Sequence, residues 1–362
     1  RIRVFFLFLF NYRNALLRSG EAFDLGRFVA DNPDLDDKAL ADKVRYAMLR
    51  RIERERTIVL GPTKKGPARM REELLRSPRV RRAMEAHARS THRTVEAVER
   101  EAERELVKLM ADQRSAWLPW INRALDWVWN RLYDGLVVDE EGIARLREAA
   151  RRGVLVLLPS HKSHVDYIVL SDVLYRHGIS CPLIAAGDNL SFWPLGWMLR
   201  RGGAFFIRRS FKGDKLYPTL VDAYMRKLIV EGFNVEFFLE GGRSRTGKLM
   251  PPKLGLLSMV VDAALKLQGR EIFFVPISIG YERIVEERSY VHELSGGEKQ
   301  RESISGLLRT PRILRSRYGR LYVQIGETFA FRSLVSAVLR DRPGRPGADP
   351  NRLSPVQRRT LV

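Results

Sequence analysis

A histidine and an aspartate stand five positions apart where an apolar segment ends. Val154–Leu158 has the composition of a buried strand, and His161 and Asp166 follow it. On an ideal helix five positions turn the chain through roughly 140°, so the two side chains would diverge. They can meet if His161 lies in a loop and Asp166 in the first turn of a helix. Ser163 fits the N-cap of that helix, and we expect the helix to start there.

Such a pair has the composition of a general base. Asp166 would accept a hydrogen bond from one imidazole nitrogen, which leaves the other nitrogen of His161 to take a proton from a hydroxyl group. Taken alone, this spacing is more often a helix cap beside an unrelated loop histidine. His164 has no comparable partner in the segment and is expected to be structural or peripheral.

Two later strands each end in cationic residues. The first, Ala204–Ile207, runs into Arg208 and Arg209. Neighbouring strand residues point to opposite faces, so we expect only one of these arginines to face the site. A planar guanidinium binds two phosphate oxygens at once, which suits a phosphomonoester. The alternative is a solvated basic strand end.

The second of these strands gives the strongest local signal. Val235–Leu239 leads into Glu240-Gly241-Gly242, where the missing side chains let the backbone approach a ligand closely. Polar and cationic residues follow: Arg243, Ser244, Arg245 and Lys248. The sequence is not a Walker A loop, and no dinucleotide fingerprint is present. A glycine turn with exposed charge is the competing interpretation.

Pro276 interrupts another apolar strand, Ile272–Ile279. Proline cannot donate to a sheet ladder, so it is expected at a sheet edge, a strand end or a bulge.

Strands and helices alternate along the part of the chain that carries these motifs. Strands are expected at 154–158, 182–186, 204–207, 235–239, 272–279 and 321–325, with helices at 165–177, 193–200, 215–230 and 254–267. The alternation predicts an α/β fold with a largely parallel or mixed central sheet flanked by helices. A helical region precedes it, with helices at 36–56, 70–110 and 116–133 and a turn-rich linker at 61–67. The second of these helices is expected to bend or break near Ser77-Pro78.

The charge and the apolar segments restrict the partners. Lys and Arg number 64 against 43 Asp and Glu, a formal net charge of +21. This favours anionic partners, which include phosphorylated metabolites, acidic proteins, anionic lipid surfaces and nucleic acid. No stretch reaches the roughly 18–20 apolar residues of a spanning helix, so membrane association of this chain would be peripheral. The single cysteine, Cys181, excludes an intrachain disulfide.

Four tryptophans lie in the expected helix at 116–133. Trp120 and Trp127 share a face, and Trp129 points nearly opposite. Indole rings favour the interface of a bilayer, but aromatic residues on opposite faces indicate that at least some lie in the core, which we place ahead of membrane contact.

In their order along the chain, the segments around His161, Arg208, Glu240 and Pro276 resemble the four motif blocks of the glycerolipid acyltransferases. Within that family the chain looks most like the bacterial membrane-bound glycerol-3-phosphate acyltransferases. Further stretches carry this likeness: Ala185–Pro194, Phe211–Tyr217 and Lys253–Gly255. The match runs roughly from Trp127 to Phe331. Asp188 stands where an uncharged residue is expected, a departure that leaves the chemistry intact.

The resemblance implies a direct acyl transfer. His161 would be the general base, oriented by Asp166, and would remove the proton of the sn-1 hydroxyl of glycerol 3-phosphate as that oxygen attacks an acyl thioester. The product would be 1-acyl-glycerol 3-phosphate, in the first step of phospholipid synthesis. A serine nucleophile is disfavoured because no Gly-x-Ser-x-Gly elbow is present. No metal or cofactor is expected, and acyl-CoA or acyl-carrier protein would be the co-substrate.

The same resemblance assigns substrate-binding positions, which are Arg208, Arg209, Glu240, Gly241, Gly242, Arg243, Ser244, Arg245, Lys248 and Pro276. Pro276 would shape the path of the acyl or pantetheine chain, although a strand-end bend explains it equally well. We expect the acyltransferase catalytic domain at 136–335 and a helical region at 61–135. Residues 1–60 would end an upstream region, and 336–362 would be a linker to a further C-terminal region.

The expected partners are glycerol 3-phosphate, acyl-CoA or acyl-carrier protein, and an anionic membrane surface, without nucleic acid. The location would be peripheral, at the cytoplasmic face of the inner membrane. One alternative is acylation of dihydroxyacetone phosphate or lysophosphatidate. Another is a basic scaffold that binds membranes or nucleic acid. A nucleic-acid module would interleave basic and exposed aromatic residues, a pattern absent from the sequence.

Overall fold

The computed structural model describes residues 22–208, 210–211, 213–267, 269–287, 290–291 and 316–340, with residues 338–340 described as backbone only. The chain divides into two units, Arg1–Val59 and Leu60–Val362. In the first unit, Asp24 caps the short helix α2 (Leu25–Ala30) by accepting a hydrogen bond from the Arg27 N–H. The helix expected at 36–56 is confirmed as α3 (Asp37–Leu60).

The helical region of the second unit contains one more break than expected. Residues 67–109 form three helices: α4 (Pro67–Leu75), α5 (Pro78–Thr91) and α6 (Val95–Leu109). The break expected near Ser77-Pro78 is confirmed, and the one before α6 was not expected. Pro67 and Pro78 start their helices because proline is tolerated in the first turn, where its missing N–H costs nothing. Thr94 begins α6 by accepting a hydrogen bond from the Ala97 N–H. The next helix is α7 (Leu118–Leu132).

Eight strands form one sheet within the described residues, in the order β1-β7-β6-β2-β5-β3-β4, with β8 pairing β6. Strands β6, β2, β5, β3 and β4 are mutually parallel, whereas β7 and β8 run antiparallel to β6. The bounds are β1 Gly135–Val138, β2 Gly153–Pro159, β3 Leu183–Gly187, β4 Ala204–Ile207, β5 Val235–Glu236, β6 Glu271–Tyr281, β7 Arg320–Ile325 and β8 Phe329–Ala330.

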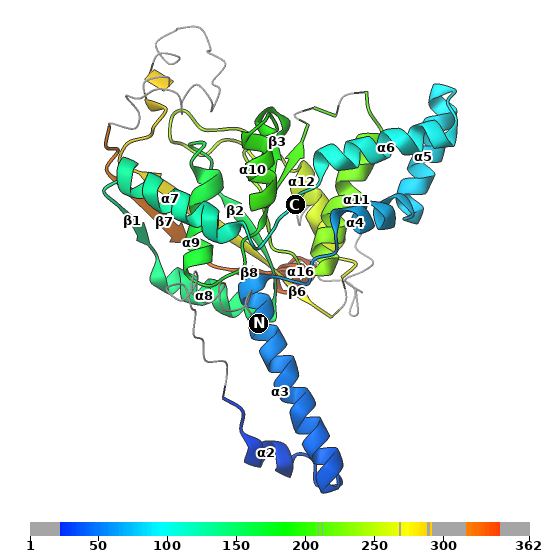
Figure 1. Cartoon of the computed structure of the whole chain (residues 1–362), viewed down its shortest axis with the longest axis vertical. Helices are drawn as coiled ribbons and strands as arrows, with labels where there is room; N and C mark the ends of the chain where they lie inside the picture. Colours follow the sequence, from blue (N-terminus) through cyan, green and yellow to red (C-terminus); the bar gives the residue numbers. More distant parts are fainter. Residues whose placement is uncertain are drawn as a thin grey trace, which may run out of the picture. The chain divides into compact units, whose positions relative to one another are not determined.

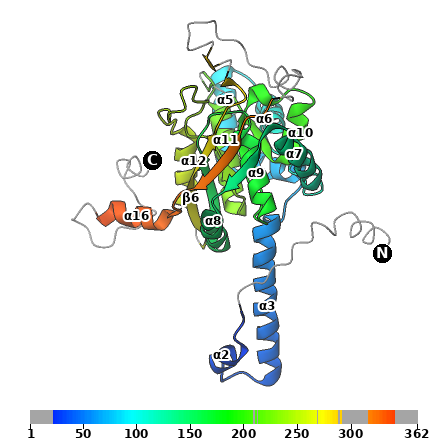
Figure 2. The same ribbon diagram turned by 90° about the vertical axis from the view of Figure 1, so that its left-hand side faces the viewer.

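Helices cover both faces of this sheet. They are α8 (Glu140–Arg152), α9 (Asp166–Arg176), α10 (Leu195–Gly202), α11 (Leu216–Glu231), α12 (Gly255–Ala264) and α16 (Phe331–Arg340), with a 3₁₀ turn, η2, at Asp188–Leu190. Figure 1 shows α7, α8 and α9 to the left of β2 and α4, α5, α6, α11 and α12 to the right of it. In the turned view, α11 and α12 again lie across the strands from α9 (Figure 2).

Alternation along β2 shows why the sheet is covered on both sides. Val154 and Val156 pack into the core under α11 and α12, whereas Leu155 and Leu157 pack into the core under α8 and α9. Successive strand residues point to opposite faces, so an uninterrupted apolar run needs helices on both. The predicted fold class is therefore confirmed. Strands β1 and β8 were not predicted from the sequence, and the strand predicted at 235–239 extends three residues beyond β5.

The expected place of Pro276 is wrong, because β6 is an internal strand. It pairs with β2 along one side, where Leu158 is opposite Pro276. On its other side β8 pairs at Phe273 and Phe274, and β7 pairs only from Ile277 onward. The Pro276 carbonyl faces this interruption and accepts a hydrogen bond from the Gly326 N–H at 2.9 Å. The missing N–H of Pro276 also faces the interruption, so no ladder bond is lost.

The tryptophans of α7 divide between core and surface. Trp129 is buried at 7% exposure, as expected, whereas Trp120 and Trp127 are 64% and 60% exposed. The expectation that at least some of these aromatic residues lie in the core is therefore confirmed, by Trp129. The expected linker at 336–362 lies outside the described residues from position 341 onward, and so do residues 1–21 of the expected N-terminal segment.

Candidate active site

The chemistry-bearing residues lie at one edge of the sheet, where its parallel strands end. Open α/β sheets bind ligands beyond the carboxyl ends of their strands. Here the segments that follow β2, β3, β4 and β5 surround a cavity of about 1120 Å³. Six of the predicted site residues line it: His161, Arg208, Gly241, Gly242, Arg243 and Arg245.

His161 and Asp166 form the expected pair. Nδ1 of His161 lies 3.1 Å from Oδ2 of Asp166. A carboxylate can only accept, so Nδ1 carries the proton and Nε2 keeps a free lone pair. His161 is only 4% exposed, yet it lines the cavity, and Asp166 is fully buried behind it. The ring of Phe238 lies 4.0 Å from the imidazole centroid, and the Tyr167 ring lies 5.0 Å away edge-on.

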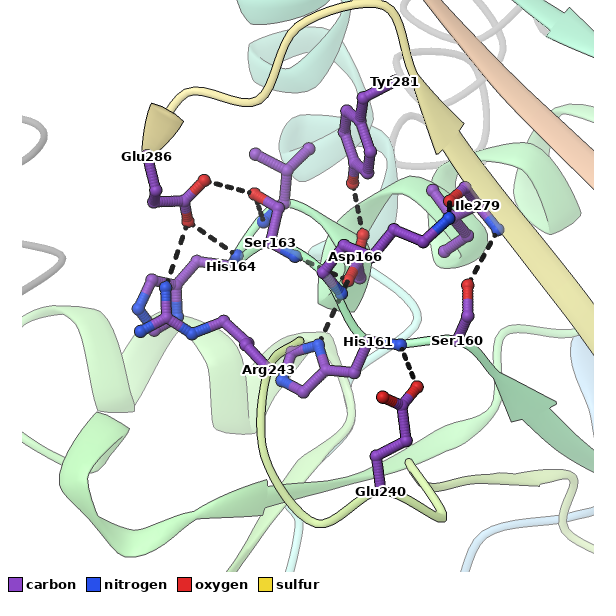
Figure 3. A network of polar contacts seen from close by, with 12 residues as sticks. Ser160, His161, Ser163, His164, Asp166, Glu240, Arg243, Ile279, Tyr281 and Glu286 are labelled. Atoms are coloured by element: carbon purple, nitrogen blue, oxygen red, sulfur yellow. Dashed lines mark hydrogen bonds and ion pairs between the residues drawn. The ribbon is translucent and has the colours of Figure 1, made fainter. Parts of the chain in front are cut away.

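Asp166 is held by three groups besides the imidazole (Figure 3). Its Oδ2 accepts from the backbone N–H groups of Lys162 and Ser163, at 2.6 and 2.9 Å. Its Oδ1 accepts from the hydroxyl of Tyr281, at the end of β6. Burial, with the neighbouring Asp166 charge, raises the pKa of Tyr281 well above its usual range. The phenol therefore remains a hydrogen-bond donor to Asp166.

The expected start of the helix at Ser163 is wrong. The α-helix begins at Asp166, because Lys162–Val165 form a tight turn around the carboxylate. One half of the expected capping box is present, since Asp166 accepts from the Ser163 N–H. Ser163 Oγ instead donates to Glu286 at 2.8 Å and accepts from the Val165 N–H at 3.1 Å.

Glu240 and Ser244 hold the loop that carries His161 (the histidine loop) through its backbone. The His161 N–H donates to Oε1 of Glu240 at 2.9 Å, and the other carboxylate oxygen accepts from the Met250 N–H. The Ser244 N–H donates to the His161 carbonyl at 2.8 Å. Both residues are buried, and neither lines the cavity. They therefore fix the position of His161.

The arginines meet the cavity with their charges already partly matched. Arg243 is 15% exposed, and its Nη1 donates to Glu286 at 3.3 Å and to the Tyr290 hydroxyl at 3.1 Å. Arg208 pairs with Glu105 and, at 3.1 Å, with Asp214. Of the two arginines that follow β4, Arg208 therefore lines the cavity, and Arg209 lies outside the described residues. Lys248 and Pro276 are exposed and do not line the cavity.

Gly241 shows why a glycine is required between the strand and the arginines. Its φ is +59°, in the left-handed region that L side chains rarely adopt. A Cβ there would lie 2.6 Å from Cδ of Lys253, another residue that lines the cavity. Gly242 has no such restriction, since a Cβ added to it would meet nothing within 4 Å.

Sequence reasoning missed three residues around this site. Tyr281 ends an apolar strand in which Pro276 is the only other signal of a site, and Glu286 lies 123 positions from its partner Ser163, in a charged stretch without a local pattern. Burial raises the pKa of Glu286, although hydrogen bonds from His164 and Ser163 and the charge of Arg243 act in the opposite direction. Burial also raises the pKa of Glu236, a fully buried carboxyl on β5. An acidic residue inside an apolar strand was the available signal for Glu236.

Neither a metal site nor a spanning helix is found in the described part of the chain. Among those residues, no group of three or more His, Cys, Asp or Glu side chains could hold a metal ion. In the same residues, no helix is both long enough and apolar enough to cross a bilayer.

Comparison with known proteins bears on this site. Residues 138–280 match the family model described as Acyltransferase, and residues 290–361 match the model described as Glycerol-3-phosphate acyltransferase C-terminal region. The first match contains the loop of His161, the segments of Arg208 and Arg243, and β6 except its last residue. The part of the chain that forms the cavity is thus similar to the acyltransferase family.

Curated relatives are similar to most of this chain. A glycerol-3-phosphate acyltransferase from Haemophilus influenzae (strain PittEE) is 38% identical over 325 residues, 90% of this chain and 40% of that protein. The one from Histophilus somni (strain 129Pt) is 40% identical over 316 residues, 87% of this chain and 38% of that protein. The chain is similar to these glycerol-3-phosphate acyltransferases over most of its own length, and it spans about two fifths of the length of these relatives.

One solved structure is similar at a lower level. The 1-acyl-sn-glycerophosphate acyltransferase from Thermotoga maritima is 18% identical, with a TM-score of 0.34, and the match covers 64% of this chain and 72% of that one.

Proposed function

We propose that this chain carries the catalytic site of a glycerol-3-phosphate 1-O-acyltransferase. The observation that supports this most strongly is the shared cavity. The His161–Asp166 pair and the guanidinium groups of Arg208, Arg243 and Arg245 come from different strand ends and surround one space. A base for an alcohol and cations for a phosphate are what glycerol 3-phosphate requires of a single site.

The proposed reaction is a direct transfer. Nε2 of His161 accepts the proton of the sn-1 hydroxyl as that oxygen forms a bond to the thioester carbonyl carbon. The Asp166 carboxylate stabilises the imidazolium that results. The C–S bond then breaks, and the thiolate leaves and takes a proton from the imidazolium. Apolar side chains of Ile207 and Phe211 line other parts of the cavity and suit the acyl chain.

The decisive experiment measures acyl transfer to radiolabelled glycerol 3-phosphate by the full-length protein, with acyl-CoA and acyl-carrier protein compared as donors. Dihydroxyacetone phosphate and lysophosphatidate are the competing acceptors. We expect 1-acyl-glycerol 3-phosphate as the product. Faster transfer to either competitor would contradict glycerol 3-phosphate as the acceptor. No transfer to any of the three acceptors would contradict the proposal that the protein is an acyltransferase.

A single variant tests the phosphate role. Arg243→Ala is expected to raise KM for glycerol 3-phosphate by roughly 10- to 100-fold, the usual value of a hydrogen-bonded charge, with little change in KM for the thioester. Arg283→Ala is the matched control, because Arg283 is exposed and pairs only with Glu287 among the interactions described here. An equal rise in both KM values would contradict a phosphate contact at Arg243.

We also propose that the protein associates peripherally with an anionic membrane surface at the cytoplasmic face of the inner membrane. Exposed tryptophans support this: Trp120 and Trp127 on α7, and Trp193 and Trp197 at α10. The two helices adjoin, since the Trp117 and Trp197 rings meet edge-on at 5.0 Å. Arg201 lies 3.9 Å from the Trp197 ring and adds positive charge. Indole rings beside cations suit the headgroup region.

Vesicle sedimentation tests this surface. The full-length protein is expected to pellet with vesicles that contain phosphatidylglycerol and to lose much of that binding when Trp193 and Trp197 are both changed to alanine. Tyr322→Ala removes an exposed aromatic from β7 and serves as the control. Equal binding by the wild type and the double variant would refute this surface.

A further inference from the structure

Glu286 contacts two parts of the site that come from different strand ends (Figure 3). Its Oε2 accepts from Ser163 Oγ at 2.8 Å, and its Oε1 accepts from the His164 N–H at 3.0 Å. The same Oε1 lies 3.3 Å from Nη1 of Arg243. The carboxylate is buried, at 2% exposure. One buried charge thus touches both the histidine loop and the arginine segment.

Tyr290 makes a second connection between the same two segments. It lies one helical turn after Glu286, and its N–H donates to the Glu286 carbonyl at 3.0 Å. Its hydroxyl accepts from Nη1 of Arg243 at 3.1 Å and donates to the Lys162 carbonyl at 3.0 Å. Arg243 and the loop of His161 are therefore linked twice, through Glu286 and through Tyr290.

The position of Ser163 extends this link to the catalytic pair. Its N–H donates to Oδ2 of Asp166, and its hydroxyl donates to Glu286. Asp166 Oδ2 is the atom that faces Nδ1 of His161. Ser163 therefore joins Glu286 to the carboxylate behind the imidazole through hydrogen bonds on both sides.

We propose that Glu286, assisted by Tyr290, is a positioning residue that couples occupancy of Arg243 to the placement of His161. This rests on the proposed function. A guanidinium has five N–H donors in a planar fork, and the contacts of Arg243 with Glu286 and Tyr290 both use Nη1. The contacts hold Arg243 in place before the substrate arrives, which lowers the entropy lost on binding. Coupling of this kind is reciprocal: the ordered loop favours phosphate binding, and bound phosphate favours the ordered loop.

Glu286→Gln tests the coupling with little change in shape. Glutamine keeps one oxygen for the His164 N–H but loses the charge that faces Arg243 and an acceptor for Ser163. We expect kcat/KM for glycerol 3-phosphate to fall by roughly 10- to 100-fold, through both a higher KM and a lower kcat, with KM for the thioester unchanged. Glu287→Gln is the matched control, because Glu287 is half exposed and pairs with Arg283. It should match the wild type.

A double-mutant cycle separates coupling from simple loss of structure. In an Arg243→Ala background, Glu286→Gln should leave KM for glycerol 3-phosphate within about twofold of its parent, because the arginine it orients is gone. Equal fold-losses in both backgrounds would overturn the coupling. If Glu286→Gln does not fold, Tyr290→Phe removes one oxygen and should raise the same KM in the same direction. An unchanged KM there would also overturn it.

The two proposals fail in different ways. If the wild-type protein does not acylate glycerol 3-phosphate, the proposed function is wrong. If the wild type is active and Glu286→Gln behaves like Glu287→Gln, the function stands and the coupling role of Glu286 is wrong.

Discussion

Replacing Asp166 by asparagine is expected to lower kcat about a thousandfold while the fold survives. The carboxylate is fully buried, and its Oδ2 lies 3.1 Å from Nδ1 of His161. Its charge stabilises the imidazolium formed when His161 takes a proton. For charge centres about 4 Å apart at an effective dielectric constant of about 20, this attraction amounts to about 4 kcal/mol. That corresponds to about three powers of ten in rate.

Asparagine suits the test because it removes charge rather than shape. Its amide oxygen can still accept from the backbone N–H groups of Lys162 and Ser163, which fix the loop. Its NH₂ group then faces the Tyr281 hydroxyl, which can rotate to accept. We therefore expect a small change in thermal stability compared with the change in rate.

Single-turnover acyl transfer at saturating donor and acceptor is the appropriate assay, since it measures chemistry rather than product release. Asp222→Asn is the control: Asp222 is a buried carboxylate on α11, paired with Arg226 and Arg79 and outside the cavity. It should lose stability and keep its rate. A folded Asp166→Asn protein within about tenfold of the wild-type rate would refute the role given to this charge.

Three other predictions concern the surroundings of the site. Gly241→Ala should lower the free energy of unfolding by about 1–2 kcal/mol because of its left-handed φ, whereas Gly242→Ala should not, as denaturant titration would measure. Tyr281→Phe should reduce kcat about tenfold with KM unchanged, since Asp166 loses one donor. Burial raises the pKa of Asp172 from 3.8 to about 6, so its contribution to stability is present below about pH 4 and is lost as pH rises through 6. Compared with Asp172→Asn, the wild type should therefore gain up to about 3 kcal/mol on going from pH 7 to pH 4 in urea titrations; an unchanged difference would contradict the shifted pKa.

The sequence predicted the parts of the site whose signals are local. Apolar runs of strand length, each followed by polar residues, predicted the sheet edge at which His161, Arg208 and Arg243 meet. Contacts between distant segments were not predictable in this way. Glu240 was expected to bind substrate, but its carboxylate accepts a hydrogen bond from the His161 N–H. This contact was not predictable because the segment around Glu240 does not show which strand end lies beside it.

Pro276 illustrates a second limit. Proline is disfavoured in an internal strand because it cannot donate to a ladder, but β8 pairs with β6 at Phe273 and Phe274 and β7 only from Ile277 onward, so no ladder bond is required at Pro276. This interruption in the pairing is a property of the paired sheet, and a single strand read along the chain does not contain it.

The hydrogen bonds from Glu240 and Ser244 reach the backbone of His161 and do not involve its ring. A protein with alanine at position 161 therefore keeps the anchors that shape the loop, although it has no group to take the proton. Such an inactive variant could bind both substrates together without turnover, for as long as a crystal takes to grow.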